Sequence, residues 1–189
     1  MIYLYGILNF IDMKRYILVL ALALAYISAF SQNTIKFLGI PIEGTKKEMI
    51  AKLQSKGYEY NSYSDELRGE FNGEDVAISV QTVNNRVWRL AIVDITGRDE
   101  ADIKIRFNTL YEQFLNNAKY KLTQGTQLKE SENISYQMTV KKKRYDAYFT
   151  FVDESINGYV WYTIAEQFGR YKIVMFYEND DNAANGDDL

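Results

Sequence analysis

The chain has 189 residues, of which 47% are hydrophobic, and its 22 basic and 25 acidic residues give a net charge of −3. It contains no cysteine and no histidine, which excludes disulfides, thiol nucleophiles, cysteine metal sites and the most common general base. This length suits one domain of ordinary size or two small fused halves.

Residues 1–31 have the pattern of a signal peptide. Lys14 and Arg15 precede an apolar run over residues 16–27, and small residues follow at a suitable site for cleavage between Ser31 and Gln32. The uninterrupted run is shorter than the roughly 20 residues of a membrane-spanning helix. We therefore expect a secreted or periplasmic protein that starts near Gln32 and has no membrane span. Met13, just before the basic pair, is an alternative translation start.

Charge is balanced in the body of the chain. Residues 32–178 carry 20 basic and 20 acidic residues, because four aspartates lie in the C-terminal segment 179–189. A balanced surface lacks the basic surplus that phosphate binding needs, so we expect no nucleic-acid partner. The acidic segment has no apolar period and is predicted to be disordered, which we favour over a calcium site at Asp180-Asp181 or Asp187-Asp188.

The first half, residues 35–97, is predicted to be a helix followed by a meander of antiparallel strands. Thr45 and Glu48 form a capping-box pattern, and Gly57 suits the end of the helix. Asn72-Gly73 and Asn84-Asn85 are hairpin signals between alternating apolar segments. The last and longest of these segments, residues 87–95, is apolar on both faces and is expected to be the central strand.

The second half, residues 98–178, repeats this order. Asp99 can cap a helix whose wide apolar stripe includes Ile103, Phe107 and Phe114. We expect a loop at residues 123–133 and then strands at residues 134–140, 145–151, 159–164 and 171–177. The predicted fold class is α+β, with two helix-plus-antiparallel-meander units and both helices packed on one face of antiparallel sheet.

The segment FLGIPIEGT (37–45), with Glu48-Met49-Ile50 and Lys56-Gly57-Tyr58 after it, resembles small secreted proteins of Bacteroides-type bacteria. The order of a strand, a turn and a helix before a meander is also similar to the β-lactamase-inhibitor-protein-like fold, which includes the BamE (SmpA/OmlA) envelope proteins. The resemblance implies a protein that presents sheet and loop surfaces to another envelope protein. The chain departs from the lipid-anchored and the disulfide-bearing members because it has no cysteine.

Catalytic patterns are sparse. Acidic residues gather at 65–75 and at Asp153-Glu154, and two carboxylates could cleave a glycoside, but acids beside a hairpin are more typical of solvated turns. No serine has a lysine three residues later, and no phosphate-binding loop occurs. We therefore predict a protein that is not an enzyme and needs no cofactor or metal.

Two features suggest binding. Lys141, Lys142, Lys143 and Arg144 are interpreted as a solvated hairpin end or, alternatively, as a docking point for an acidic partner, a lipid headgroup or an anionic polysaccharide.

The second feature is aromatic. If Phe149, Trp161 and Ile173 face the second helix, the period of two places Tyr148, Tyr162 and Phe176 on the opposite face. Such a face packs against the other half or another copy, or it forms an exposed platform. Our leading hypothesis is a binding module for an envelope or secreted protein. The alternatives are a carbohydrate-binding module using the same aromatics and a small hydrolase using two carboxylates.

Overall fold

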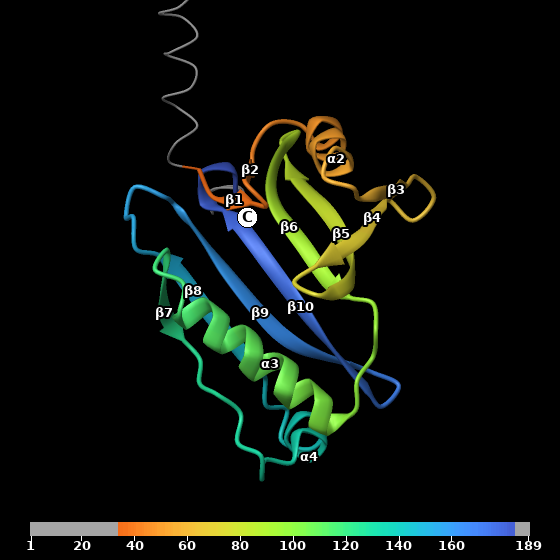
Figure 1. The fold of residues 1–189 in the computed structure, drawn as a ribbon, viewed down its shortest axis with the longest axis vertical. Helices are drawn as coiled ribbons and strands as arrows, with labels where there is room; N and C mark the ends of the chain where they lie inside the picture. Colours follow the sequence, from red (N-terminus) through yellow and green to blue (C-terminus); the bar gives the residue numbers. More distant parts are fainter. Residues whose placement is uncertain (1–33, 184–189) are drawn as a thin grey trace, which may run out of the picture. The chain divides into compact units, whose positions relative to one another are not determined.

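The computed structural model describes residues 34–183, and Figure 1 shows the order of their elements. The first half contains β1 (Lys36–Phe37), β2 (Ile40–Pro41), α2 (Lys46–Gln54), β3 (Glu59–Asn61), β4 (Glu66–Phe71), β5 (Glu74–Val83) and β6 (Arg86–Asp94). The second half contains α3 (Glu100–Leu115), β7 (Tyr120–Gln124), α4 (Ile134–Thr139), β8 (Asp146–Phe151), β9 (Gly158–Gln167), β10 (Arg170–Asn179) and the 3-10 helix η1 (Asp180–Asn182).

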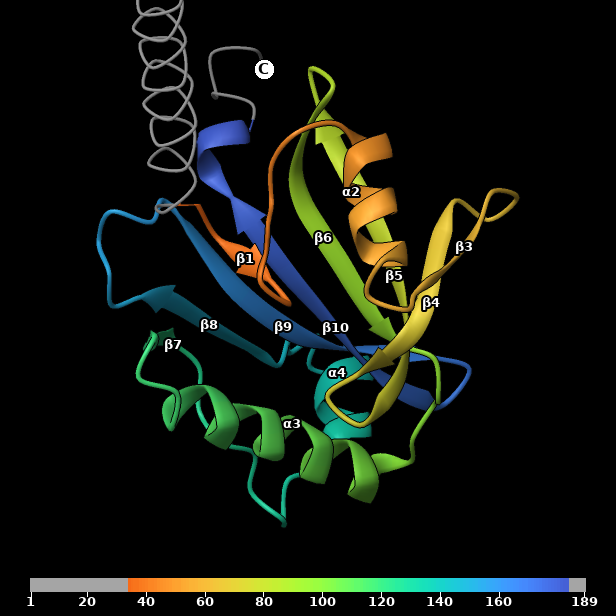
Figure 2. The same ribbon diagram turned by 45° about the horizontal axis from the view of Figure 1, so that its top comes forward.

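One antiparallel sheet of eight strands runs through both halves in the order β3-β4-β5-β6-β10-β9-β8-β7 (Figure 2). Each half contributes four strands to this sheet after its first helix, with α4 inserted between β7 and β8 in the second half. The last strands of the two halves, β6 and β10, pair in the middle with Ile92 opposite Met175. The α+β prediction is confirmed, and β6 is a central strand as expected. β1 and β2 form a separate two-stranded sheet.

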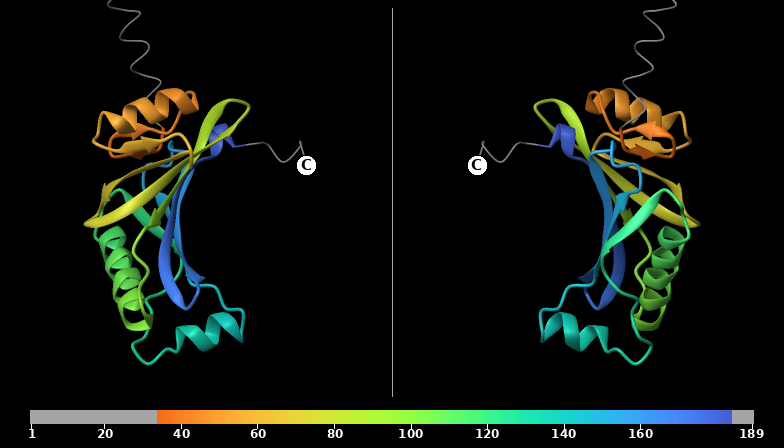
Figure 3. Two further views of the ribbon diagram at one scale, coloured as in Figure 1. Left: turned by 90° about the vertical axis from the view of Figure 1, so that its right-hand side faces the viewer. Right: turned by 90° about the vertical axis from the view of Figure 1, so that its left-hand side faces the viewer.

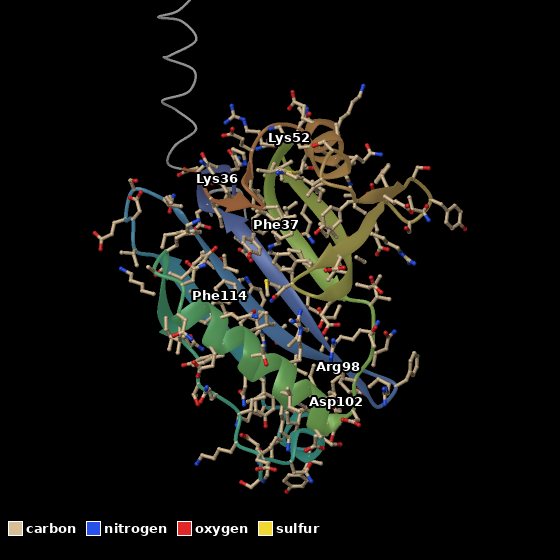
Figure 4. The ribbon with its side chains drawn as sticks, viewed as in Figure 1. Lys36, Phe37, Lys52, Arg98, Asp102 and Phe114 are labelled. Carbon is tan, nitrogen blue, oxygen red and sulfur yellow. The ribbon has the colours of Figure 1, made fainter. Side chains whose placement is uncertain are left out.

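The helices α2 and α3 lie on the same face of the large sheet, as predicted (Figure 3). Met49 and Leu53 of α2 and Phe107 and Phe114 of α3 are buried against it. Figure 4 labels Phe114 on this helix-bearing side of the sheet. Each such buried side chain stabilises the fold by about 1.5–3 kcal/mol relative to the exposed side chain.

Buried ion pairs fix α3 to the end of β6. Asp94 is buried and accepts hydrogen bonds from Arg106 Nε of α3 at 3.2 Å and from Arg98 Nη1 at 2.9 Å. Arg98 also pairs with Glu74 at the start of β5. The start of α3 is thereby tied to the first half of the sheet, because removing one partner of such a pair leaves a buried charge unmatched.

The local signals of the first half are confirmed. The Thr45 hydroxyl accepts from the Glu48 amide at 3.3 Å, and the Glu48 carboxylate accepts from the Thr45 amide at 2.8 Å. The Asn72-Gly73 and Asn84-Asn85 turns have positive φ at both positions, 54° and 74° in the first and 49° and 62° in the second. Two-residue hairpins use these dihedrals because they match the twist of the paired strands.

The segment after α3 differs from the prediction. Residues 134–139 form the helix α4 and not a strand, and residues 120–124, partly assigned to a loop, form the edge strand β7. The Asn133 side chain caps α4 by accepting from the Tyr136 amide at 2.7 Å, and Glu100 of α3 accepts from the Ile134 amide at 2.7 Å. These contacts satisfy backbone amides at the start of α4, and one of them comes from a residue 34 positions away. The alternation of apolar residues at 134–140 therefore wrongly predicted a strand, because it could not register this distant contact.

The chain ends lie partly outside the described residues. The predicted signal peptide, residues 1–31, and the last part of the acidic segment, residues 184–189, are outside them. The earlier part of that segment is ordered, contrary to the prediction: Asn179 is the buried last residue of β10, and Asp180–Asn182 form η1. Among residues 34–183, no helix is long and apolar enough to cross a membrane.

Candidate functional site

The face of the large sheet opposite to α2 and α3, here called the open face, carries a row of three stacked aromatic rings. Tyr148 of β8, Trp161 of β9 and Phe176 of β10 are direct cross-strand partners, and all three are partly exposed. Ring centroids are 5.1 Å apart for Tyr148 and Trp161 and 4.3 Å for Trp161 and Phe176, with interplanar angles of 7° and 21°. These spacings bracket the roughly 4.8 Å between neighbouring strands, so the rings stand edge-up on the sheet. We call this set the aromatic row.

Arg89 of β6 extends the aromatic row at the Phe176 end. Its guanidinium carbon lies 5.1 Å from the Phe176 ring centroid and 4.0 Å from the ring centroid of Trp88. The pairing of β5 with β6 contains a β-bulge. Gln81 lies opposite Arg89 and the next residue, Thr82, lies opposite Val87, so Trp88 is the extra residue of the bulge. The bulge breaks the alternation that would have placed Trp88 with buried Leu90, and it leaves the Trp88 ring partly exposed beside Arg89.

A buried carboxylate on the same face of the sheet holds one side of the aromatic row. Glu178 is 1% exposed and receives the Trp161 indole N–H at 2.5 Å, the Tyr159 hydroxyl at 2.7 Å and Arg89 Nη2 at 2.8 Å. Burial, and then the hydrogen bond to Glu178, raise the pKa of Tyr159. Because charged hydrogen bonds are stronger than neutral ones, the carboxylate fixes the orientation of the indole and of the guanidinium.

Small side chains border the aromatic row on the side of the first half. The cross-strand partner of Phe176 on β6 is Ala91, and the partner of Ala91 on β5 is Ser79. Ala77 and Val93 form the next pair along the same two strands. The open face therefore has large aromatic rings over β8, β9 and β10 and shorter side chains over β5 and β6. A partner surface could be complementary in shape to this difference in height.

The structure agrees with two of the three predicted aromatic positions. Tyr148 and Phe176 are on the open face, whereas Tyr162 is fully buried under α3 and donates its hydroxyl to the Phe107 carbonyl at 3.1 Å. Burial raises the pKa of Tyr162. Trp161, which the alternation predicts on the helix side, occupies the position expected for Tyr162. Val160 and Ile164 flank Tyr162 at a spacing of two, and these aliphatic neighbours were the signal for the correct face.

The basic run is not a hairpin end, because it follows helix α4. Lys143 pairs with Glu132 and lies over the Tyr145 ring at 4.5 Å, and Arg144 pairs with Asp146 at 3.2 Å. Burial raises the pKa of Tyr148, and Asp146 and Arg144 act on it in opposite directions.

Lys141 lies 5.8 Å from the Tyr136 ring centroid, and Lys142 is exposed with a positive φ. Of the run, Arg144 alone is thus placed near the aromatic row, and its charge is matched by Asp146.

The acidic candidates are held by separate partners. Asp65 pairs with Lys46 and accepts from the Tyr60 hydroxyl, and Asp153 accepts from Ser155. These contacts lower the pKa of both carboxyls, that of Asp65 mainly through Lys46. Within residues 34–183, no group of three or more acidic side chains is arranged to hold a metal ion.

Comparison of the chain with family models, with curated proteins and with solved structures finds no match.

Proposed function

We propose that this protein is a non-enzymatic binding module, secreted or periplasmic, that recognises another protein through the open face of its large sheet. The observation that carries the proposal is the aromatic row, Tyr148, Trp161 and Phe176, which is partly exposed in the middle of a face that neither α2 nor α3 covers. Tyrosine, tryptophan and arginine are the residues enriched at the energetic centres of protein interfaces.

The aromatic row is also organised before any partner binds. Glu178 fixes the Trp161 indole and the Arg89 guanidinium, and each ring is stacked on its neighbour. Side chains that are already immobile lose little entropy on association, which leaves more of the contact energy for affinity. This arrangement supports a recognition surface better than a set of mobile surface aromatics would.

The ring orientation favours a protein over a carbohydrate. A sugar stacks on the open face of an aromatic ring, but both faces of Trp161 are occupied by Tyr148 and Phe176. The second face of Phe176 lies beside Arg89. Apart from the outer face of Tyr148, on which no ring stacks among the described residues, the row therefore offers ring edges and the tyrosine hydroxyl to a ligand. These suit the mixed apolar and polar surface of a protein.

Site-specific photo-crosslinking tests this function. A photoreactive phenylalanine analogue replaces Thr163 or, separately, Ser79, both partly exposed on the open face, in the full chain expressed in its source cells. Ile105, exposed on α3, is the control position. We expect one polypeptide to be cross-linked from both open-face positions, not from position 105, and to be lost when Trp161→Ala is added.

Equal labelling from position 105, or no polypeptide adduct from the open face, would contradict the proposal. The same Trp161→Ala pair on an array of immobilised glycans tests the alternative. Glycan binding that this substitution removes, without any polypeptide adduct, would favour the carbohydrate-binding module.

A further inference from the structure

The turn between β9 and β10 places a phenylalanine, Phe168, in a left-handed backbone conformation that this residue type disfavours. Phe168 and Gly169 have φ values of 54° and 72°, close to those of the Asn72-Gly73 and Asn84-Asn85 turns. Asparagine tolerates this left-handed conformation because its short polar side chain bonds locally, whereas a bulky side chain there is an outlier. Phenylalanine in place of asparagine at such a position lowers the equilibrium constant for folding by roughly fivefold.

Packing within the described residues does not compensate this cost. The Phe168 side chain is 94% exposed, so its ring contributes almost no buried apolar area to the fold. The turn itself is held by the Glu166 side chain, whose carboxylate oxygen Oε1 accepts from the Gly169 amide at 2.6 Å. Phe168 thus serves neither the turn nor the core.

Phe168 lies on the hairpin that carries two rings of the aromatic row. Trp161 and Phe176 belong to β9 and β10, and these strands stay paired from this position to Gln167 and Arg170, which flank the turn at the hairpin tip. Residues 165–167 are exposed, and β8 begins at Asp146 opposite Thr163, so the tip extends beyond the edge of its neighbour. Seven residues of extended chain place Phe168 roughly 20 Å from Trp161, within the span of one interface of about 800 Å² per partner.

We propose that Phe168 is an anchor residue that inserts into an apolar pocket of the protein that covers the aromatic row. This inference rests on the proposed function and adds a second contact point to it. A protein pocket suits the tip better than a lipid surface does. Glu166 and Arg170 balance in charge on either side of the turn, and one phenylalanine without basic surplus gives little affinity for a bilayer.

The reciprocal substitutions Phe168→Asn and Asn84→Phe test the inference in the full chain. Phe168→Asn should shift the unfolding equilibrium toward the folded state by roughly fivefold, because it restores the preferred turn residue. The same variant should bind the purified polypeptide identified by cross-linking at Thr163 roughly 30-fold more weakly, as expected for loss of an interface anchor. Asn84→Phe should lower stability by a similar factor and leave this affinity unchanged.

A gain in stability combined with a loss of binding cannot come from misfolding. Unchanged affinity of Phe168→Asn would overturn the anchor and leave the proposed function standing, and the absence of any polypeptide adduct at Thr163 would overturn both. Binding of the wild-type chain, but not of Phe168→Asn, to vesicles of phosphatidylcholine and phosphatidylglycerol in equal parts would overturn the protein pocket in favour of a lipid surface.

Discussion

Replacement of Glu178 by glutamine is the most direct test of how the open face is held. Glutamine has nearly the same shape, so it removes the charge while leaving the space filled. Three donors, from Arg89, Tyr159 and Trp161, bond to the buried carboxylate. Charged hydrogen bonds contribute about 1.5–3 kcal/mol each, and neutral ones about 1 kcal/mol. Losing the difference at three contacts destabilises the protein by about 3 kcal/mol.

Urea unfolding followed by tryptophan fluorescence measures this free energy, and an unchanged denaturant slope shows that the change is in stability. Glu154→Gln is the matched control. Its carboxylate is 87% exposed and faces Lys121 at 3.5 Å, so its loss should cost less than about 0.5 kcal/mol. A Glu178→Gln variant that unfolds with the free energy of this control would refute the view that the carboxylate organises the aromatic row.

A double-mutant cycle with Arg89→Met then apportions the effect. If the ion pair carries much of it, Glu178→Gln should cost about 1–2 kcal/mol less in the Arg89→Met background than in the wild type. Strictly additive costs would assign the stabilisation to Tyr159 and Trp161 instead.

Three further measurements follow from the tyrosines and the charges. Tyr162→Phe should destabilise the fold by about 1 kcal/mol, because it removes the buried hydrogen bond from the Tyr162 hydroxyl to the Phe107 carbonyl, yet it should not change cross-linking at Thr163. A loss of adduct would contradict the burial of Tyr162. Burial raises the pKa of Tyr145, Tyr159 and Tyr162. The stability that these neutral tyrosines contribute is therefore complete below about pH 10 and declines above it. Phenolate absorbance should rise together with unfolding. Lys143, and then Tyr145, lower the pKa of Glu132. The stability difference between wild type and Glu132→Gln should therefore be largest near neutral pH and shrink as the pH falls below about 4. A difference independent of pH would show that the ion pair is not linked to folding.

Part of the candidate site could be read from the sequence. Alternation places Tyr148 and Phe176 correctly because each lies in a strand whose other face is strongly apolar, such as Phe149 and Met175. In β9 both faces carry aromatic side chains, Trp161 on one and Tyr162 on the other, and a shift of one residue exchanges them. Val160 and Ile164 favour the register that buries Tyr162, and the packing of Tyr162 under α3 decides it.

The sequence by itself determined the features that depend on neighbouring residues. The Thr45–Glu48 capping box, the Asp99 cap of α3 and the asparagine turns are local, because their donors and acceptors lie within a few positions of each other. Tertiary structure decided the features that join distant segments: the pairing of β6 with β10, the contact of Glu100 with the start of α4, and the convergence of Arg89, Tyr159 and Trp161 on Glu178. The physical reason is that these contacts form only when the strands are already in register, so no spacing along the chain encodes them.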